Sequence, residues 1–315
     1  GIPFFTDAGN GSMYTHNVSA TDNGAAENTA YGFTAMDAIT TGDKNTAIGF
    51  KAGSAINTGS DNTILGAYAG DAITTGAGNV AIGYEALTTE DAHGRNVAVG
   101  YKALLIQNAG ANAFNVAVGY EAGLLVSTGV QNTLIGGLAG DALTTGSGNV
   151  ALGYNALSTE DAHGRNIAIG SSALTTLNAG ADAYNIAIGF NSGYAMTTAT
   201  RNTIMGGLAG DALTTGSRNV AIGYAALSQE DGNSFNVAIG DSALTQLNAG
   251  ANGYNVAVGY QSGQAVTTGT NNTLIGGLAG DAITTGTFNT ILGYATGGAI
   301  TTGEQNTLIG SLAGD

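Results

Sequence analysis

Residues 132–157 read NTLIGGLAGDALTTGSGNVALGYNAL. The same phrase begins twice in this stretch, at Asn132 and at Asn149, where Asn is followed by three apolar or β-branched residues and then Gly. Side chains alternate between two faces along a strand, so a strand at a soluble surface normally shows one polar face. Neither face of these segments is polar, which predicts that both faces are covered.

The Asn phrase recurs along almost the whole chain. Its spacing is 17 residues, except for three intervals of 19, and four turns form a super-repeat of 70 residues. A Gly always follows four residues after the Asn, and Ala stands seven residues after it in 14 of 17 cases. A fixed period of this kind predicts a solenoid of 17 stacked turns. The Asn column comprises Asn28, Asn45, Asn62, Asn79, Asn96, Asn115, Asn132, Asn149, Asn166, Asn185, Asn202, Asn219, Asn236, Asn255, Asn272, Asn289 and Asn306.

Positions in a turn are numbered from this Asn, so that Asn+4 is the invariant Gly. A second Gly stands at Asn+14 in 12 of the 16 complete turns. Two Gly columns predict two reversals per turn, and hence an all-β, flattened parallel β-roll with two strands per coil. The longer turns carry their two extra residues after the second Gly, where an insertion leaves the strand register unchanged. We expect the roll to span 28–315 and to continue beyond 315, and 1–27 to be a non-repetitive cap or connector.

The strand at Asn+1 to Asn+3 is apolar on both sides. Asn+1 is always β-branched, and Asn+2 and Asn+3 are apolar with the exception of Tyr31. One side can fill the roll, and the other then needs a partner, because one turn buries only about four apolar side chains. We therefore expect a homo-oligomer, with three chains as the favoured number. The large residues at Asn+2 are the expected trimer face: Ile64, Leu134, Ile204, Leu274 and Ile291.

Composition excludes several classes of function. The net charge is −15 with only seven Lys and Arg, so nothing in the chain can neutralise many phosphates, and nucleic acid is an unsuitable partner. Gly, Thr and Asn interrupt every apolar run, which argues against membrane insertion by this segment. Cys is absent, so disulfides and thiolate metal sites are excluded.

The string Asn79, Val80, Ala81, Ile82, Gly83, with Ala86 three residues on, resembles the head repeat of trimeric autotransporter adhesins, and Asn219 to Ala226 repeats it. The resemblance implies a left-handed parallel β-roll of three chains. Similar repeats occur in bacteriophage tail fibres and other trimeric surface fibres. This chain departs from the family in its longer repeat and in keeping Asn where the family often has Ser.

For most residues that could bind a ligand or catalyse a reaction, we favour a structural role. Stacked Asn side chains predict an amide ladder that satisfies turn backbone groups. The acidic pairs Glu90–Asp91, Glu160–Asp161 and Glu230–Asp231 offer the two carboxylates of a glycosidase, but neighbouring side chains on a turn point apart. His93 and His163 lie four turns apart, too far to share a metal within one chain. We expect no metal, no cofactor and no catalytic site.

Aromatic residues at Asn+5, such as Tyr84 and Tyr154, suit packing at the roll's edge better than sugar stacking. Adjacent Thr pairs face opposite ways, which disfavours ice binding. The inserted loops are the better recognition elements, because loops on rigid scaffolds commonly bind receptors. Their candidate contact residues are Asn108, Asn112, Phe114, Asn178, Asp182, Tyr184, Asn248, Asn252 and Tyr254.

These features predict an extracellular structural and adhesive fibre that lies on a bacterial cell surface or on a virion. We expect it to attach to a cell-surface glycan, protein or matrix receptor. The alternatives left open are a bacteriophage tail fibre or tailspike, including one that degrades glycans, and an ice-binding solenoid.

Overall fold

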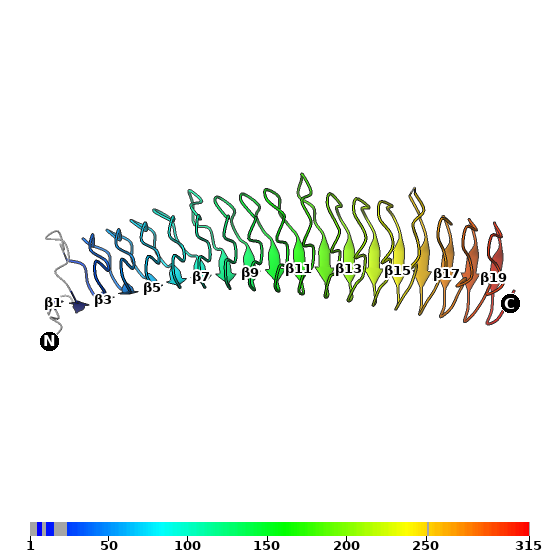
Figure 1. Cartoon of the computed structure of the whole chain (residues 1–315), viewed down its shortest axis with the longest axis horizontal. Coiled ribbons are helices and arrows are strands. Elements are labelled where there is room, and N and C mark those ends of the chain that lie inside the picture. The colour runs from blue at the N-terminus through cyan, green and yellow to red at the C-terminus, as the bar shows by residue number, and fades with distance from the viewer. Residues whose placement is uncertain (1–4, 8–10, 16–23, 251, 315) are drawn as a thin grey trace. The chain divides into compact units, whose positions relative to one another are not determined.

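The computed structural model describes residues 5–7, 11–15, 24–250 and 252–314. It divides into two compact units, Gly1–Tyr154 and Asn155–Asp315. Every regular element among the described residues is a β-strand, and the protein is a parallel β-solenoid of about 17 turns (Figure 1). The described part contains no helix long and apolar enough to cross a membrane.

The strands are short and follow the Asn column. The first unit contains β1 (Phe5–Asp7), β2 (Ser12–Tyr14), β3 (Thr29–Tyr31), β4 (Thr46–Ile48), β5 (Thr63–Leu65), β6 (Val80–Ile82), β7 (Val97–Val99), β8 (Val116–Val118), β9 (Thr133–Ile135) and β10 (Val150–Leu152). The second contains β11 (Ile167–Ile169), β12 (Ile186–Ile188), β13 (Thr203–Met205), β14 (Val220–Ile222), β15 (Val237–Ile239), β16 (Val256–Val258), β17 (Thr273–Ile275), β18 (Thr290–Leu292) and β19 (Thr307–Ile309).

Parallel pairing joins each strand to the next in register within each unit. Leu134 of β9 pairs with Ala117 of β8 and with Ala151 of β10, so equivalent residues stack directly. The 19-residue turns keep this register, as Ala168 of β11 pairs with Ala187 of β12. At the other end of the first unit, β1 and β2 form an antiparallel hairpin, and β2 pairs in parallel with β3. Residues 1–4, 8–10 and 16–23 of the expected cap lie outside the described residues.

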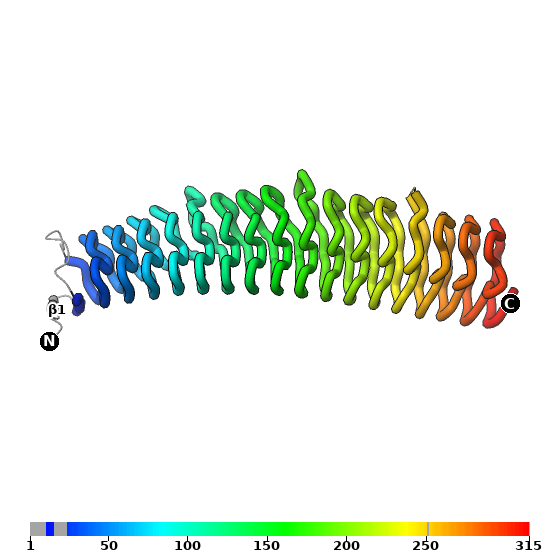
Figure 2. Tube along the Cα trace, in the orientation of Figure 1, coloured from blue at the N-terminus to red at the C-terminus, as the bar shows by residue number. Residues whose placement is uncertain are grey.

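The expectation of two strands per coil is wrong, because each turn contains one strand. The other side consists of two consecutive tight turns: Ala139 N–H donates to Gly136 O, and Leu143 N–H donates to Gly140 O. Leu138 and Gly140 both have a φ of 57°, a left-handed conformation that is incompatible with an extended strand. This side is nevertheless bonded from turn to turn, since Gly123 N–H donates to Ala139 O at 2.9 Å. Figure 2 shows the resulting coils.

The two Gly columns have different physical causes. Gly136 combines a φ of 133° with close approach, since a Cβ there would lie 2.5 Å from Gly153 O. Gly129, at Asn+14, does not have a positive φ, but a Cβ would collide with the Gly146 carbonyl of the next turn. Stacked backbones therefore require Gly at Asn+4 and favour it at Asn+14, where four turns carry another residue.

The core lies inside each single chain and includes the residues that we expected at a trimer face. Ile64, Leu134, Ile204, Leu274 and Ile291 are fully buried, so that expectation is wrong. Asn+2 points inward, and the small residue at Asn+7 and most residues at Asn+11, such as Leu143, are buried as well. The outward side of the strand is the one formed by Asn+1 and Asn+3.

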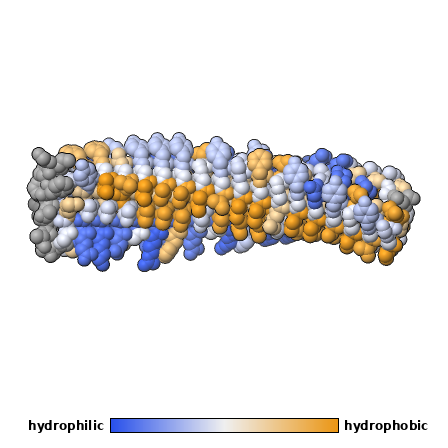
Figure 3. Space-filling model, turned by 90° about the horizontal axis from the view of Figure 1, so that it is seen from below, coloured by the Kyte–Doolittle hydropathy of each residue, from blue (hydrophilic) through white to orange (hydrophobic). Residues whose placement is uncertain are grey.

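That outward side remains apolar. Besides Tyr31, the more exposed side chains at Asn+3 are Ile48, Leu65 and Leu152 in the first unit and Met205, Ile275, Leu292 and Ile309 in the second, each 38 to 68% exposed. We call the residues at Asn+1 and Asn+3 the strand-face strip. Figure 3, viewed from the side towards which the strands of Figure 1 point, shows an apolar band that follows the turns.

The Asn column forms a buried ladder. Asn132 Oδ1 accepts the N–H of Asn149 at 2.9 Å, and Asn132 Nδ2 donates to Gly146 O at 2.9 Å. Asn132 N–H in turn donates to Asn115 Oδ1 at 2.8 Å. In ordinary turns such a side chain therefore links the start of one strand to the next turn and also fixes its own second corner.

Candidate functional site in the acidic turns

Three glutamates occupy a column that is otherwise mostly aliphatic. Asn+11 is an interior position, occupied by Ile73, Leu143 and Leu213 in ordinary turns. Glu90, Glu160 and Glu230 stand in this column, and all three are 0% exposed. The sequence interpretation placed these acids on an exposed turn and missed their burial. The aliphatic period at Asn+11 is the signal that identifies them as inward-facing.

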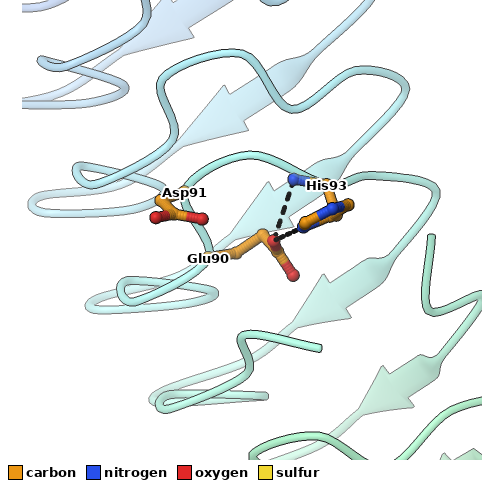
Figure 4. A group of neighbouring side chains, drawn as sticks. All are labelled: Glu90, Asp91 and His93. Carbon is orange, nitrogen blue, oxygen red and sulfur yellow. Dashed lines mark hydrogen bonds and ion pairs between the residues drawn. The ribbon is translucent and has the colours of Figure 1, made fainter. Parts of the chain in front are cut away.

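The Glu90 carboxylate faces the loop that follows it (Figure 4). Its Oε1 accepts the backbone N–H of His93 at 3.1 Å and lies 3.9 Å from Nδ1 of the same residue. Its Oε2 lies 3.5 Å from Nδ2 of Asn96. Asp91 is exposed, yet it brings a carboxylate oxygen within 4.8 Å of the Glu90 and His93 donor atoms.

The second unit contains two related copies of this arrangement. Glu160 Oε1 accepts the N–H of His163 at 3.2 Å and lies 3.3 Å from its Nδ1. In the third copy, Asn233 replaces the histidine, and its Nδ2 donates to Glu230 Oε2 at 3.1 Å. A buried carboxylate with a polar side chain three residues later is therefore common to all three copies.

Each glutamate lies in the turn before a 19-residue turn, and the hydrogen bonds explain this placement. In ordinary turns the ladder Asn donates to the carbonyl at Asn+14, as Asn79 does to His93 O at 3.2 Å. The longer turns break this bond, and Asn96 faces Glu90 instead. In the second copy, Glu160 Oε2 accepts the N–H of Ala179 within the inserted loop at 3.2 Å. The glutamate carboxylates therefore replace the backbone hydrogen-bond acceptors that the inserted residues displace.

Burial also raises the pKa of two of these carboxyl groups, Glu90 and Glu230. Loss of solvation raises the pKa of Glu90, and the N–H of His93 partly offsets that effect. Loss of solvation raises the pKa of Glu230 to about 7 despite the hydrogen bonds from Asn233. A carboxyl group buried in this way cannot flank a glycosidic bond together with its exposed neighbour, so the geometry gives glycoside cleavage no support.

The inserted loops project beyond the neighbouring turns at the edge opposite to the one towards which the strands point (Figures 1 and 2). Most of their candidate contact residues are exposed, namely Asn112, Phe114, Asn178, Asp182, Tyr184, Asn248, Asn252 and Tyr254, and Asn108 is partly exposed. Two of these side chains also have internal roles. Asn112 Oδ1 accepts the N–H of Gly94 at 3.2 Å, and Asp182 Oδ1 accepts that of Gly164 at 3.1 Å.

Arginines of the preceding turn hold the ends of the first two loops, and Phe235 stacks on Tyr254 at the end of the third, a feature that the sequence interpretation missed. Arg165 lies over the Tyr184 ring at 5.4 Å, donates to its hydroxyl at 3.0 Å and pairs with Asp182. Arg95 lies over Phe114 at the same distance of 5.4 Å. The loops are therefore exposed but anchored, which suits preorganised recognition.

The aromatic residues at Asn+5 are exposed rather than packed into an edge. In the first unit, Tyr101 stacks on Tyr84 and on Tyr120, with ring centroids 5.5 and 5.2 Å apart. The ring of Tyr101 therefore has neighbours on both sides, and its stacking surface is not free for a sugar.

No protein-family model matches this chain, and a comparison with curated proteins finds no match.

Proposed function

We propose that this chain is a rigid segment of an extracellular, trimeric structural and adhesive fibre, in which the strand-face strip joins the chains and the inserted loops contact a receptor. The left-handed coil and the number of three chains come from the resemblance to trimeric adhesin heads. The observation that carries the proposal is the exposed apolar strip.

The strip has the properties of a protein interface. Neither Asn+1 nor Asn+3 carries a charged residue in any of the 17 turns. Exposed apolar patches that continue over many residues usually mark contact surfaces. The chain has a net charge of −15, so copies repel one another unless they approach along an uncharged surface. The strip provides such a surface on every turn.

The loops supply the adhesive part of the proposal. They recur at a fixed interval of 70 residues, and an arginine or, in the third loop, Phe235 of the preceding turn contacts the aromatic residue at the end of each, so each chain presents several similar contact points. Three chains side by side multiply weak contacts into high avidity without any strong single contact.

A matched pair of substitutions tests the role of the strip. Leu152 lies on it and is 42% exposed, whereas Leu125 lies on the turn side and is 41% exposed. Leu152→Glu should shift the protein from oligomer towards monomer in sedimentation velocity, while Leu125→Glu should leave the oligomer intact. Equal behaviour of the two variants would refute the assignment. Cell-binding assays on the same variants then test whether adhesion follows oligomerisation.

A further inference from the structure

The acidic turns contain one feature that their structural role does not use. In the first copy, Nδ1 of His93 is buried and has no hydrogen-bond partner, although it faces the Glu90 carboxylate at 3.9 Å. In the third copy, the amide of Asn233 donates directly to Glu230 at 3.1 Å. An asparagine is therefore sufficient to hydrogen-bond the glutamate, whereas a histidine also provides a metal-ligand nitrogen.

What it offers is a set of metal donors. Glu90, Asp91 and His93 each place one ligand atom within 4.8 Å of the other two, and Glu160, Asp161 and His163 do the same. Each set combines two carboxylates with one imidazole, a ligand mixture that suits Zn²⁺ and related divalent transition metals. The glutamate is buried, the aspartate is exposed, and the side chain of His93 is 31% exposed, so an ion can approach from the solvent side.

The distances are close to those that Zn²⁺ needs. Bonds of about 2.0–2.1 Å in a tetrahedral site place neighbouring ligand atoms roughly 3.3 Å apart. The separation of 3.3 Å between Glu160 Oε1 and His163 Nδ1 already matches, and that of 3.9 Å at Glu90 requires a small rotation. In the first set, Asp91 is exposed and lies beside Glu90 (Figure 4), with a carboxylate oxygen within 4.8 Å of the other two ligand atoms.

We propose that Glu90, Asp91 and His93 form one Zn²⁺ site and that Glu160, Asp161 and His163 form a second. Water completes the coordination of each ion. Two carboxylates and a neutral imidazole balance the ion's charge, which offsets the cost of burying the glutamate. The ion also ties the histidine loop to the core. Because Gly94 N–H donates to Asn112 and Gly164 N–H to Asp182, each site lies directly beneath an inserted loop.

Isothermal titration of the chelator-treated chain with ZnCl₂ tests the proposal. The wild-type chain should bind two ions, and the His93→Asn/His163→Asn double variant should bind none. This double variant should fold, because it copies the third turn, where Asn233 stands naturally; its circular dichroism spectrum should match the wild type. Each single variant should bind one ion. The control variant His16→Asn, at a position outside the described residues, should still bind two.

Two results would overturn the assignment. One is the absence of saturable Zn²⁺ binding by the wild-type chain, which would leave the histidines with a structural role only. The other is binding by the double variant equal to that of the wild type, which would place the ions elsewhere. Neither result affects the proposed fibre, whose test is oligomerisation.

Discussion

Gly136 and Gly137 are adjacent, but the structure predicts opposite responses to the same substitution. Gly136 has a φ of 133°, and a Cβ on it would lie 2.5 Å from the carbonyl oxygen of Gly153 in the next turn. Gly137 does not have a positive φ, and the nearest atom to its Cβ would be Cδ2 of Tyr154 at 3.6 Å, an ordinary contact. Ala67 occupies the equivalent position in another turn.

The magnitudes follow from these two environments. For Gly136→Ala, the strained backbone costs about 1–3 kcal/mol, and forcing a methyl against a neighbouring carbonyl costs about 1–3 kcal/mol more. For Gly137→Ala, reduced freedom of the unfolded chain should leave stability unchanged or raise it by about 0.4–1 kcal/mol. The difference between the two variants should therefore be about 2–7 kcal/mol.

Urea denaturation followed by circular dichroism measures this difference, with hydrogen exchange to locate any loosening near β9 and β10. Solenoids can unfold in parts, so the comparison should use the first transition. Equal denaturation midpoints for Gly136→Ala and Gly137→Ala would refute the argument that the stacked corners exclude a side chain.

Two further substitutions test the ladder and the buried acids. Asn132→Ala removes the partners of Gly146 O and Asn149 N–H and should cost about 2–6 kcal/mol at about 1–3 for each unpaired group, whereas Asn108→Ala in a partly exposed loop should cost little in the same denaturation assay. Burial raises the pKa of Glu230 from 4.5 in the unfolded chain to about 7 in the folded one. Its contribution to stability is therefore complete below pH 4.5 and is lost as pH rises through 7, so the free energy of unfolding should fall by about 3 kcal/mol over this range. Glu230→Gln should abolish that part of the pH dependence; an unchanged profile would exclude Glu230 as its source.

The repeat and its strands could be predicted from the sequence because they depend on spacing alone. Asn132 and Asn149 mark successive turns, and the strands lie directly after them as expected. The inward face could not be assigned in the same way, since Leu134 and Ile135 are both apolar. Side-chain size was the available clue. Asn+2 is Ala in most turns, and a thin coil has room inside for small side chains, whereas the bulky Val and Ile at Asn+1 and Asn+3 lie outside.

Two other features conflict with local preferences. Leu87 and Leu104 have φ values near 50°, a conformation that leucine rarely adopts, so propensity alone would not predict the tight turns on the second side. In this conformation Leu87 N–H donates to Ala103 O of the next turn at 3.0 Å, so stacking of the turns stabilises it. The burial of Glu90 is similar, since its acidic neighbour Asp91 is exposed and the pair resembles a surface turn. Both features arise from contacts between turns rather than from the local sequence.

The most direct test of the fibre proposal is the molar mass of the untagged chain in solution, measured by size-exclusion chromatography with light scattering at physiological salt. The account predicts about three times the chain's 30.9 kDa, unchanged on dilution through the micromolar range. A folded species with the mass of one chain would contradict it, because the strand-face strip would then be stable in water without a partner.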